Sequence, residues 1–231
     1  MELPLAIERA CAEAAAAALA GALTVEQAEA LSSGAVAAAH PALAKLPEKQ
    51  RANLVRLHWA ERVSWCLFTS AWQDSLAALI TTRFGATRVV EVCAGAGVLG
   101  RTMRQRGLDW VATDLRPAAG DSTVLRAGAL DAVRDLAPEL VFWSWWSKPK
   151  ASAGCEAATA ATPEDAQVVS HCRSRGIPVV FVGEPRGGLT GSTALWDGPW
   201  AAVPAASFVL PSATDFTAAF VDVPRWRGFS D

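Results

Sequence analysis

The sequence predicts an α/β protein built on a doubly wound, mostly parallel sheet. From Arg88 onward, short β-branched runs alternate with helical segments, and that alternation is typical of parallel strands covered by helices. A glycine-rich turn joins the first of these strands to its helix. The chain has 231 residues, 52% of them hydrophobic, which is enough to bury a large core. We expect two parts, a helical region over residues 1–85 and the sheet domain over residues 86–231.

The helical region is expected to begin with alanine-rich helix and to continue through two longer helices. Thr24 and Gln27 form a capping-box pattern, which predicts a helix over residues 25–39 that Pro41 stops. Another helix is expected from Pro47 onward, because apolar residues recur there at helical spacing. These residues are Trp65, Phe68, Trp72, Leu76 and Leu79.

Five strands are expected in the sheet, over residues 88–93, 110–113, 122–126, 140–143 and 178–182. The helices between them are expected over residues 98–106, near residues 130–136, and from Pro163 to Gly176. Two later apolar runs, residues 207–210 and 216–223, have a short connection, so the sheet is expected to end in an antiparallel hairpin. Residues 148–162 either border the ligand site at the carboxyl ends of the strands or form a surface insertion.

Composition disfavours several classes of protein. A formal net charge of −2 supplies no basic footprint for nucleic acid. The five cysteines are scattered without a C-x-x-C pair, so we expect neither a disulfide framework nor a metal site, and a cytoplasmic location fits. The sequence contains no apolar run long enough to span a membrane, and acidic residues argue against reading the first alanine-rich helix as a signal peptide.

The most informative stretch is the turn after the first strand, where Gly95, Gly97 and Gly100 spell G-x-G-x-x-G. Glycines let the chain turn sharply and approach a ligand, and the following helix offers free N–H groups. These features suit NAD and S-adenosylmethionine alike. Glu91 distinguishes the two cofactors, because an ionised carboxylate inside a buried strand needs a polar or cationic partner and a cationic sulfonium would supply one. Gly100 is then expected to be a packing position.

On these residues the sequence resembles the class I S-adenosylmethionine-dependent methyltransferases, which have a Rossmann-like fold. The segment VVEVCAGAG matches that family's first strand and loop, and Asp114 matches the acid that ends its second strand. The resemblance implies that Glu91 orients the loop and the methionine end of the cofactor, that Gly95 and Gly97 lie against it, and that Asp114 binds the ribose hydroxyls. We also expect cofactor contacts from Cys93, Ala94, Leu115, Leu130 and Asp131. Ser144 could contact the cofactor or the substrate, or could simply form part of a turn.

The sequence departs from the family pattern at two positions. Cys93 stands where many members have a glycine, and we expect it to be accommodated without a catalytic role. Many members also place an acid directly after a glycine that follows the third strand, to meet the adenine amino group, whereas Ala129 follows Gly128 here. Asp131 could serve one turn later, backbone N–H groups could replace it, or Asp131 could simply favour the start of its helix.

Candidate substrate residues follow the fourth and fifth strands. Trp145 and Trp146 are expected to wall a pocket, whereas Trp143 is expected in the core. Glu184 is the candidate general base, or a ligand for a substrate amine, with a solvated turn acid as the alternative.

The helical region is expected to act as a lid over the cofactor. His58 and Trp72 are its candidate substrate contacts, although its aromatic residues could instead bury a homodimer seam or pack as core. Arg101, Arg104 and Arg106 are expected on the solvated face of the helix after the loop.

Together these residues predict a methyltransferase that acts on O, N or C of a small aromatic or amine-bearing metabolite. No amide- or acid-Pro-Pro-aromatic signature of the nucleic acid and glutamine methyltransferases is present, which agrees with the acidic charge. Two alternatives stay open: an NAD-dependent oxidoreductase, and a non-catalytic partner protein that binds S-adenosylmethionine.

Overall fold

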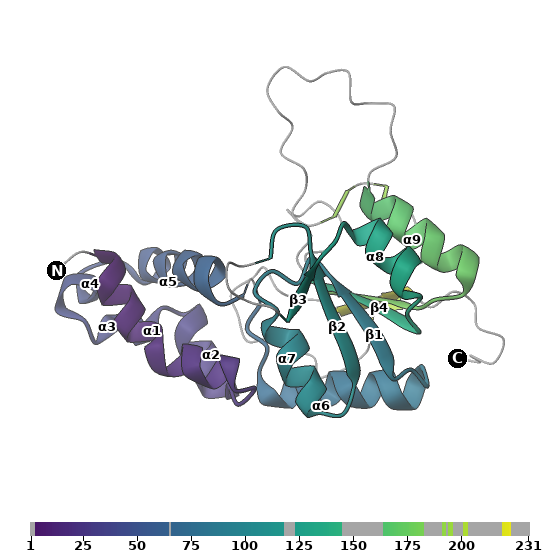
Figure 1. The fold of residues 1–231 in the computed structure, drawn as a ribbon. Coiled ribbons are helices and arrows are strands. Elements are labelled where there is room, and N and C mark those ends of the chain that lie inside the picture. The colour runs from purple at the N-terminus through teal and green to yellow at the C-terminus, as the bar shows by residue number, and fades with distance from the viewer. Residues whose placement is uncertain are drawn as a thin grey trace, which may run out of the picture.

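The computed structural model describes residues 3–64, 66–117, 123–144, 164–182, 191–192, 194–195, 201–202 and 219–222. It shows an α/β fold whose sheet has the strand order β3-β2-β1-β4-β5-β7-β6 (Figure 1). Five strands are parallel: β1 Arg88–Val92, β2 Asp109–Asp114, β3 Val124–Arg126, β4 Leu140–Ser144 and β5 Val179–Val182. All five predicted strands are thus present. The strand order reverses between β1 and β4, and ligands of such sheets bind outside the carboxyl ends of the strands at this point.

The antiparallel end of the sheet differs from the prediction. Strand β7, Ala219–Asp222, runs antiparallel to β5, and the short strand β6, Ala201–Ala202, runs antiparallel to β7. Strand β7 falls inside the second run predicted for a hairpin, but its partners are β5 and β6. The predicted pairing of residues 207–210 with 216–223 is therefore wrong for β7, and residues 207–210 lie outside the described residues.

Helices cover both faces of the sheet (Figure 1). Helices α6, Ser70–Ala78, and α7, Val98–Gln105, lie on one face, and α8, Ala129–Leu136, and α9, Glu164–Arg175, lie on the other. Side chains alternate between these faces along each strand, as the pleat requires. Val89 and Phe142 join the cluster under α6 and α7, whereas Val90 and Trp143 join the cluster under α8 and α9. Trp143 is completely buried, which confirms its prediction as core.

The five described helices that come before α6 have an apolar core of their own. They are α1 Leu3–Leu19, α2 Val25–Ser32, α3 Ala35–Ala38, α4 Pro41–Ala44 and α5 Glu48–Arg62, called here the N-terminal bundle. Figure 1 shows the bundle beside the sheet, on the side away from α9. None of the described helices combines the length and apolar character needed to cross a membrane.

Arg106, just after α7, ties the bundle to the sheet. Its guanidinium lies 2.8 Å from the Asp74 carboxylate and also donates to Ser70 Oγ and to the Gly21 carbonyl. Arg104 donates to the carbonyl of Trp110 at 2.9 Å. The predicted solvated face is therefore wrong for these two arginines, because neighbouring elements surround the end of α7.

The helical region is more broken than the sequence predicts. The capping box of Thr24 and Gln27 is confirmed, but α2 ends at Ser32, and Pro41 begins α4 instead of stopping a helix. Helix α5 ends at Arg62, and a new helix starts when Thr69 Oγ1 accepts the Trp72 N–H at 3.2 Å. Helix α6 then passes into a π-helical turn, η1, over Leu79–Arg83. The apolar residues predicted to line one helix from Pro47 onward thus belong to several elements. Trp65 lies outside the described residues.

Candidate functional site

The glycine loop lies at the carboxyl end of β1, where the strand order reverses. Gly95 and Gly97 adopt left-handed backbone angles, with φ of 57° and 64°. A Cβ atom placed on Gly95 would meet no atom of the described residues within 4 Å, so among these residues the loop borders open space. Helix α7 begins directly after Gly97, which has no side chain to cap it, and the Glu91 carboxylate accepts the Gly100 N–H in its first turn. The loop therefore offers free space and a helix N-terminus, which together suit a bound ligand.

Cys93 also adopts a left-handed backbone angle, with φ of 58°. This conformation costs an L-residue other than glycine about 1–2 kcal/mol. Burial raises the pKa of the Cys93 thiol, and the nearby carboxylates of Asp114, Glu164 and Glu91 raise it further. A thiol held protonated is a poor nucleophile, which supports the expectation that Cys93 has no catalytic role.

Asp114, at the end of β2, holds the glycine loop. Its Oδ2 accepts the Gly95 N–H at 2.8 Å and its Oδ1 accepts the Arg116 N–H at 2.7 Å. Each carboxylate oxygen can accept a second hydrogen bond, so the group can still bind a diol. Leu115 follows with 61% of its surface exposed and forms an apolar patch beside this carboxylate. The structure thus brings together Gly95, Asp114 and Leu115, three of the predicted cofactor residues.

Glu91 is buried, as expected, and its partner lies within the protein. Its side chain is 2% exposed on the face of β1 that α7 covers, and its Oε2 accepts the Trp110 indole N–H at 2.7 Å. Burial raises the pKa of Glu91 to about 7, against the opposing effects of the Trp110 bond, Arg104 and the Gly100 N–H. The carboxylate thus has the polar partner that burial requires, supplied by Trp110 on the adjacent strand, so it does not need a cationic ligand for that purpose, and its role toward the cofactor stays a prediction.

Gly100 packs over the same carboxylate. A Cβ atom at this position would lie 2.9 Å from Trp110 Cδ1, 3.1 Å from Ala112 Cβ and 3.2 Å from Glu91 Oε2. No side chain fits there without moving β2 or α7. The prediction that the third glycine is a packing position is confirmed.

Two acidic residues border Gly128, on the far side of the loop. A Cβ atom on Gly128 would lie 3.6 Å from both Asp131 Oδ2 and Glu164 Oε1. Glu164 also accepts the Leu130 N–H at 3.5 Å. The sequence pointed to Asp131 alone, because Glu164 comes 34 residues after Leu130 and nothing local links the two. Asp131 is exposed in the first turn of α8.

Carboxylates gather near Cys93 in the loop. The carboxylates of Asp114, Glu164 and Glu91 act together on Cys93 in the loop. Within the described part of the chain, no three His, Cys, Asp or Glu residues are placed to hold a metal ion. Carboxylates gathered in this way favour a cationic group and disfavour an anionic one.

Comparison with known proteins adds no assignment. No family model matches the chain, and no curated protein matches it either.

The predicted substrate residues have mixed outcomes. Trp145, Trp146 and Glu184 lie outside the described residues, so their roles stay predictions. Ser144 ends β4 beside Val182 and is half-buried at the carboxyl edge.

Trp72 and His58 are both buried. Trp72 is 1% exposed, and its ring centroid lies 4.7 Å from that of Phe68, so its assignment as a substrate contact is wrong and it belongs to the core. His58 is buried in α5, with Nδ1 3.2 Å from an Arg62 nitrogen, and burial lowers its pKa. Its neighbour Trp59 instead lines a pocket beside α7.

Proposed function

We propose that this chain binds S-adenosylmethionine at the glycine loop and transfers its methyl group to a small metabolite. The observation that carries the proposal is the group of carboxylates around Cys93. In a dinucleotide site the pyrophosphate lies against this loop, and its two negative charges would be repelled by Glu164. A sulfonium and an ammonium group would be attracted.

The residues at the loop fit the proposed cofactor. The open space beside Gly95 leaves room for it, and the unused lone pairs of Asp114 suit the ribose hydroxyls. The exposed side chain of Leu115 offers an apolar surface for a purine, and Glu164 or Asp131 could accept a hydrogen bond from its amino group. Glu91 supports the site indirectly, because it fastens β2 and α7 to the strand that carries the loop.

When bound, S-adenosylmethionine supplies an electrophilic methyl group, and the chain's own part is to align the acceptor and exclude water. We expect the acceptor to be an O, N or C atom of an aromatic or amine-bearing metabolite. Glu184, Trp145 and Trp146 are the residues proposed for the acceptor side. The N-terminal bundle is proposed as the lid, since its Trp59 lies near Val98 at the start of α7.

An NAD-dependent oxidoreductase is the second candidate. The close packing at Gly100 favours it, because the third glycine of a dinucleotide fingerprint has that role. Asp114 suits both cofactors and does not separate them.

Calorimetry with S-adenosylhomocysteine and with NAD⁺, run in parallel, tests the proposal. We expect S-adenosylhomocysteine to bind with a dissociation constant of about 1–100 μM and NAD⁺ to bind at least about 10-fold more weakly. Binding of NAD⁺ without binding of S-adenosylhomocysteine would overturn the proposal.

A second assay separates an enzyme from a non-catalytic binding protein. The chain is incubated with S-adenosylmethionine and the small-molecule fraction of a cell extract. We expect S-adenosylhomocysteine to accumulate, as measured by mass spectrometry against a sample without protein. Binding without any accumulation would favour the non-catalytic alternative.

A further inference from the structure

Glu91 is bonded to the start of α7 as well as to the neighbouring strand. The Gly100 N–H, in the first turn of α7, donates to the Glu91 carboxylate, which reaches it from β1. A Cβ atom on Gly100 would lie 3.2 Å from Glu91 Oε2, so the helix backbone lies directly over the carboxylate. Gly97, the residue before α7, has no side chain that could do the same. Glu91 therefore takes the place of an N-cap residue from inside the fold.

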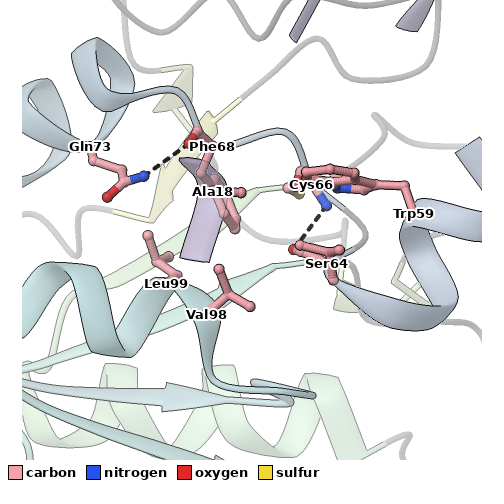
Figure 2. Close-up of a pocket in the computed structure, with 9 residues that line it drawn as sticks. Ala18, Trp59, Ser64, Cys66, Phe68, Gln73, Val98 and Leu99 are labelled. Atoms are coloured by element: carbon pink, nitrogen blue, oxygen red, sulfur yellow. Dashed lines mark hydrogen bonds between the residues drawn. The ribbon is translucent and has the colours of Figure 1, made fainter. Parts of the chain in front are cut away.

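The first turn of α7 is also packed on its other side. Figure 2 shows Val98 and Leu99 pointing from the start of α7 toward Ala18 of α1 and Phe68 before α6. Val98 and Leu99 are both buried, and they directly follow the glycine loop. A change in the charge of Glu91 therefore acts on a packed helix end that adjoins the loop.

Few charged groups of the described residues act on the Glu91 carboxylate. Arg104 on α7 favours its charged form, and Asp114 on β2 opposes it. The Cys93 thiol in the loop is kept protonated, mainly by burial. In the same cluster, β4 and α6 supply aromatic rings, which do not titrate. Burial outweighs the favourable contacts and raises the pKa of Glu91 to about 7, where a small change in its surroundings changes its charge.

A ligand at the loop would bring such a change. Glu91 is 2% exposed, so water screens its interaction with a nearby charge only weakly. We propose that Glu91 is a proton switch for the glycine loop: a cationic ligand bound there makes its carboxyl group release a proton to water, and an anionic ligand makes it keep the proton. Cations therefore bind at the loop more tightly as pH rises, and anions bind less tightly. That the cation is a sulfonium rests on the proposed function, whereas the coupling does not.

S-adenosylmethionine and S-adenosylhomocysteine are matched probes, because they differ by one methyl group and by the charge on sulfur. Calorimetry gives both affinities at about pH 5.5 and about pH 7. A nearby cation lowers the pKa of a carboxyl group by about 1–3 pH units, so the affinity ratio of S-adenosylmethionine to S-adenosylhomocysteine should rise at least about fourfold between these values. In Glu91→Gln the ratio should stay constant. The exposed Glu61→Gln is the control and should behave like the wild type.

A ratio that rises equally in the wild type and in Glu91→Gln would overturn the proposal, because titration of the ligands or of other groups would then explain it. A ratio that is constant or falls in the wild type would also overturn it. If neither ligand binds at either pH, the proposed function fails, and the switch is decided by a test without ligand.

That test uses ¹³C,¹⁵N-labelled protein, titrated through the range in which Glu91 changes charge. The side-chain carboxyl carbon of Glu91 should titrate with a midpoint at about pH 7, and the amide signals of Leu99 and Gly100 should follow the same midpoint. Trp110→Phe removes the indole donor and keeps a ring, so it should raise the midpoint. Amide signals that do not follow Glu91, or a midpoint that Trp110→Phe leaves unchanged or lowers, would contradict the coupling.

Discussion

Glu91 and Asp114 lie on neighbouring strands at the same loop, yet one is sealed under α7 and the other lies at the open edge of the sheet. The carboxylate of Glu91 accepts the indole N–H of Trp110 and is 2% exposed. The carboxylate of Asp114 accepts the backbone N–H groups of Gly95 and Arg116 and keeps lone pairs that a ligand could use. Spacing within a motif can therefore predict that an acid lies near a site. Whether that acid is free to bind a ligand or supports the fold depends on its neighbours, such as Trp110 beside Glu91.

Substitution of Asp114, at the open edge of the sheet, should affect ligand binding more than substitution of the residues beneath α7. In Asp114→Ala, we expect the affinity for S-adenosylhomocysteine to fall about 100-fold, since charged hydrogen bonds to the ligand and the anchor of Gly95 are both lost. Calorimetry measures the change, with Asp109→Ala at the exposed start of β2 as control. A loss smaller than about threefold would mean that Asp114 only holds the loop.

Substitution of the residues packed between α7 and β2 should affect the free energy of unfolding more than substitution at the open edge. Gly100→Ala places a methyl group 2.9 Å from Trp110, so we expect the free energy of unfolding to fall by about 2 kcal/mol. Urea denaturation measures it, with Gln105→Ala on the same helix as control. A change below about 0.5 kcal/mol would show that β2 and α7 can separate easily.

The buried carboxylate should make stability depend on pH. The pKa of Glu91 is about 7 in the fold against 4.5 ordinarily, so the folded state binds more protons than the unfolded state between these values. The wild type therefore loses stability as pH rises through this window, by at most about 1.4 kcal/mol per pH unit.

Glu91→Gln should remove this loss, because an amide oxygen can still accept from Trp110 without becoming charged. Unfolding of both proteins is measured at pH 5, 6 and 7, with the exposed Glu61→Gln as control. We expect the variant to gain stability relative to the wild type as pH rises and to keep its affinity for S-adenosylhomocysteine within a few-fold. If the free energies of unfolding of the two proteins changed with pH in parallel, the raised pKa of Glu91 would be contradicted.

The smallest expected effect concerns Cys93. Its left-handed backbone costs about 1–2 kcal/mol, and glycine would remove that cost while adding about 0.5–1 kcal/mol of chain entropy. We therefore expect Cys93→Gly to be about 0.5 kcal/mol more stable than Cys93→Ala in thermal unfolding. A less stable glycine variant would show that the loop is unstrained.

The sequence predicts those parts of the fold that depend on local pattern. The five parallel strands, the capping box at Thr24 and the end of α9 before Gly176 all follow from periodicity and capping residues. The break before α6 was missed because apolar spacing continues across it and outweighs the cap at Thr69. The partners of β7 depend on contacts between distant segments, which no local pattern records.

The candidate site could likewise be predicted only where local sequence patterns place its residues. Gly95, Asp114 and Leu115 were found because the motif carries them. The partner of Glu91 was missed because Trp110 lies 19 residues away and meets it only across the sheet. Glu164 was missed because it reaches Leu130 from another helix.

The most direct measurement follows the amide signals of ¹⁵N-labelled protein during titration with S-adenosylhomocysteine. We expect the largest ¹H–¹⁵N shifts at residues 94–97, 114–116 and 130, with the Trp110 indole N–H barely moving because it stays bonded to Glu91. Largest shifts at the Trp110 indole and Gly100, or no shifts at the loop at saturating ligand, would contradict the assignment of the open edge as the binding site.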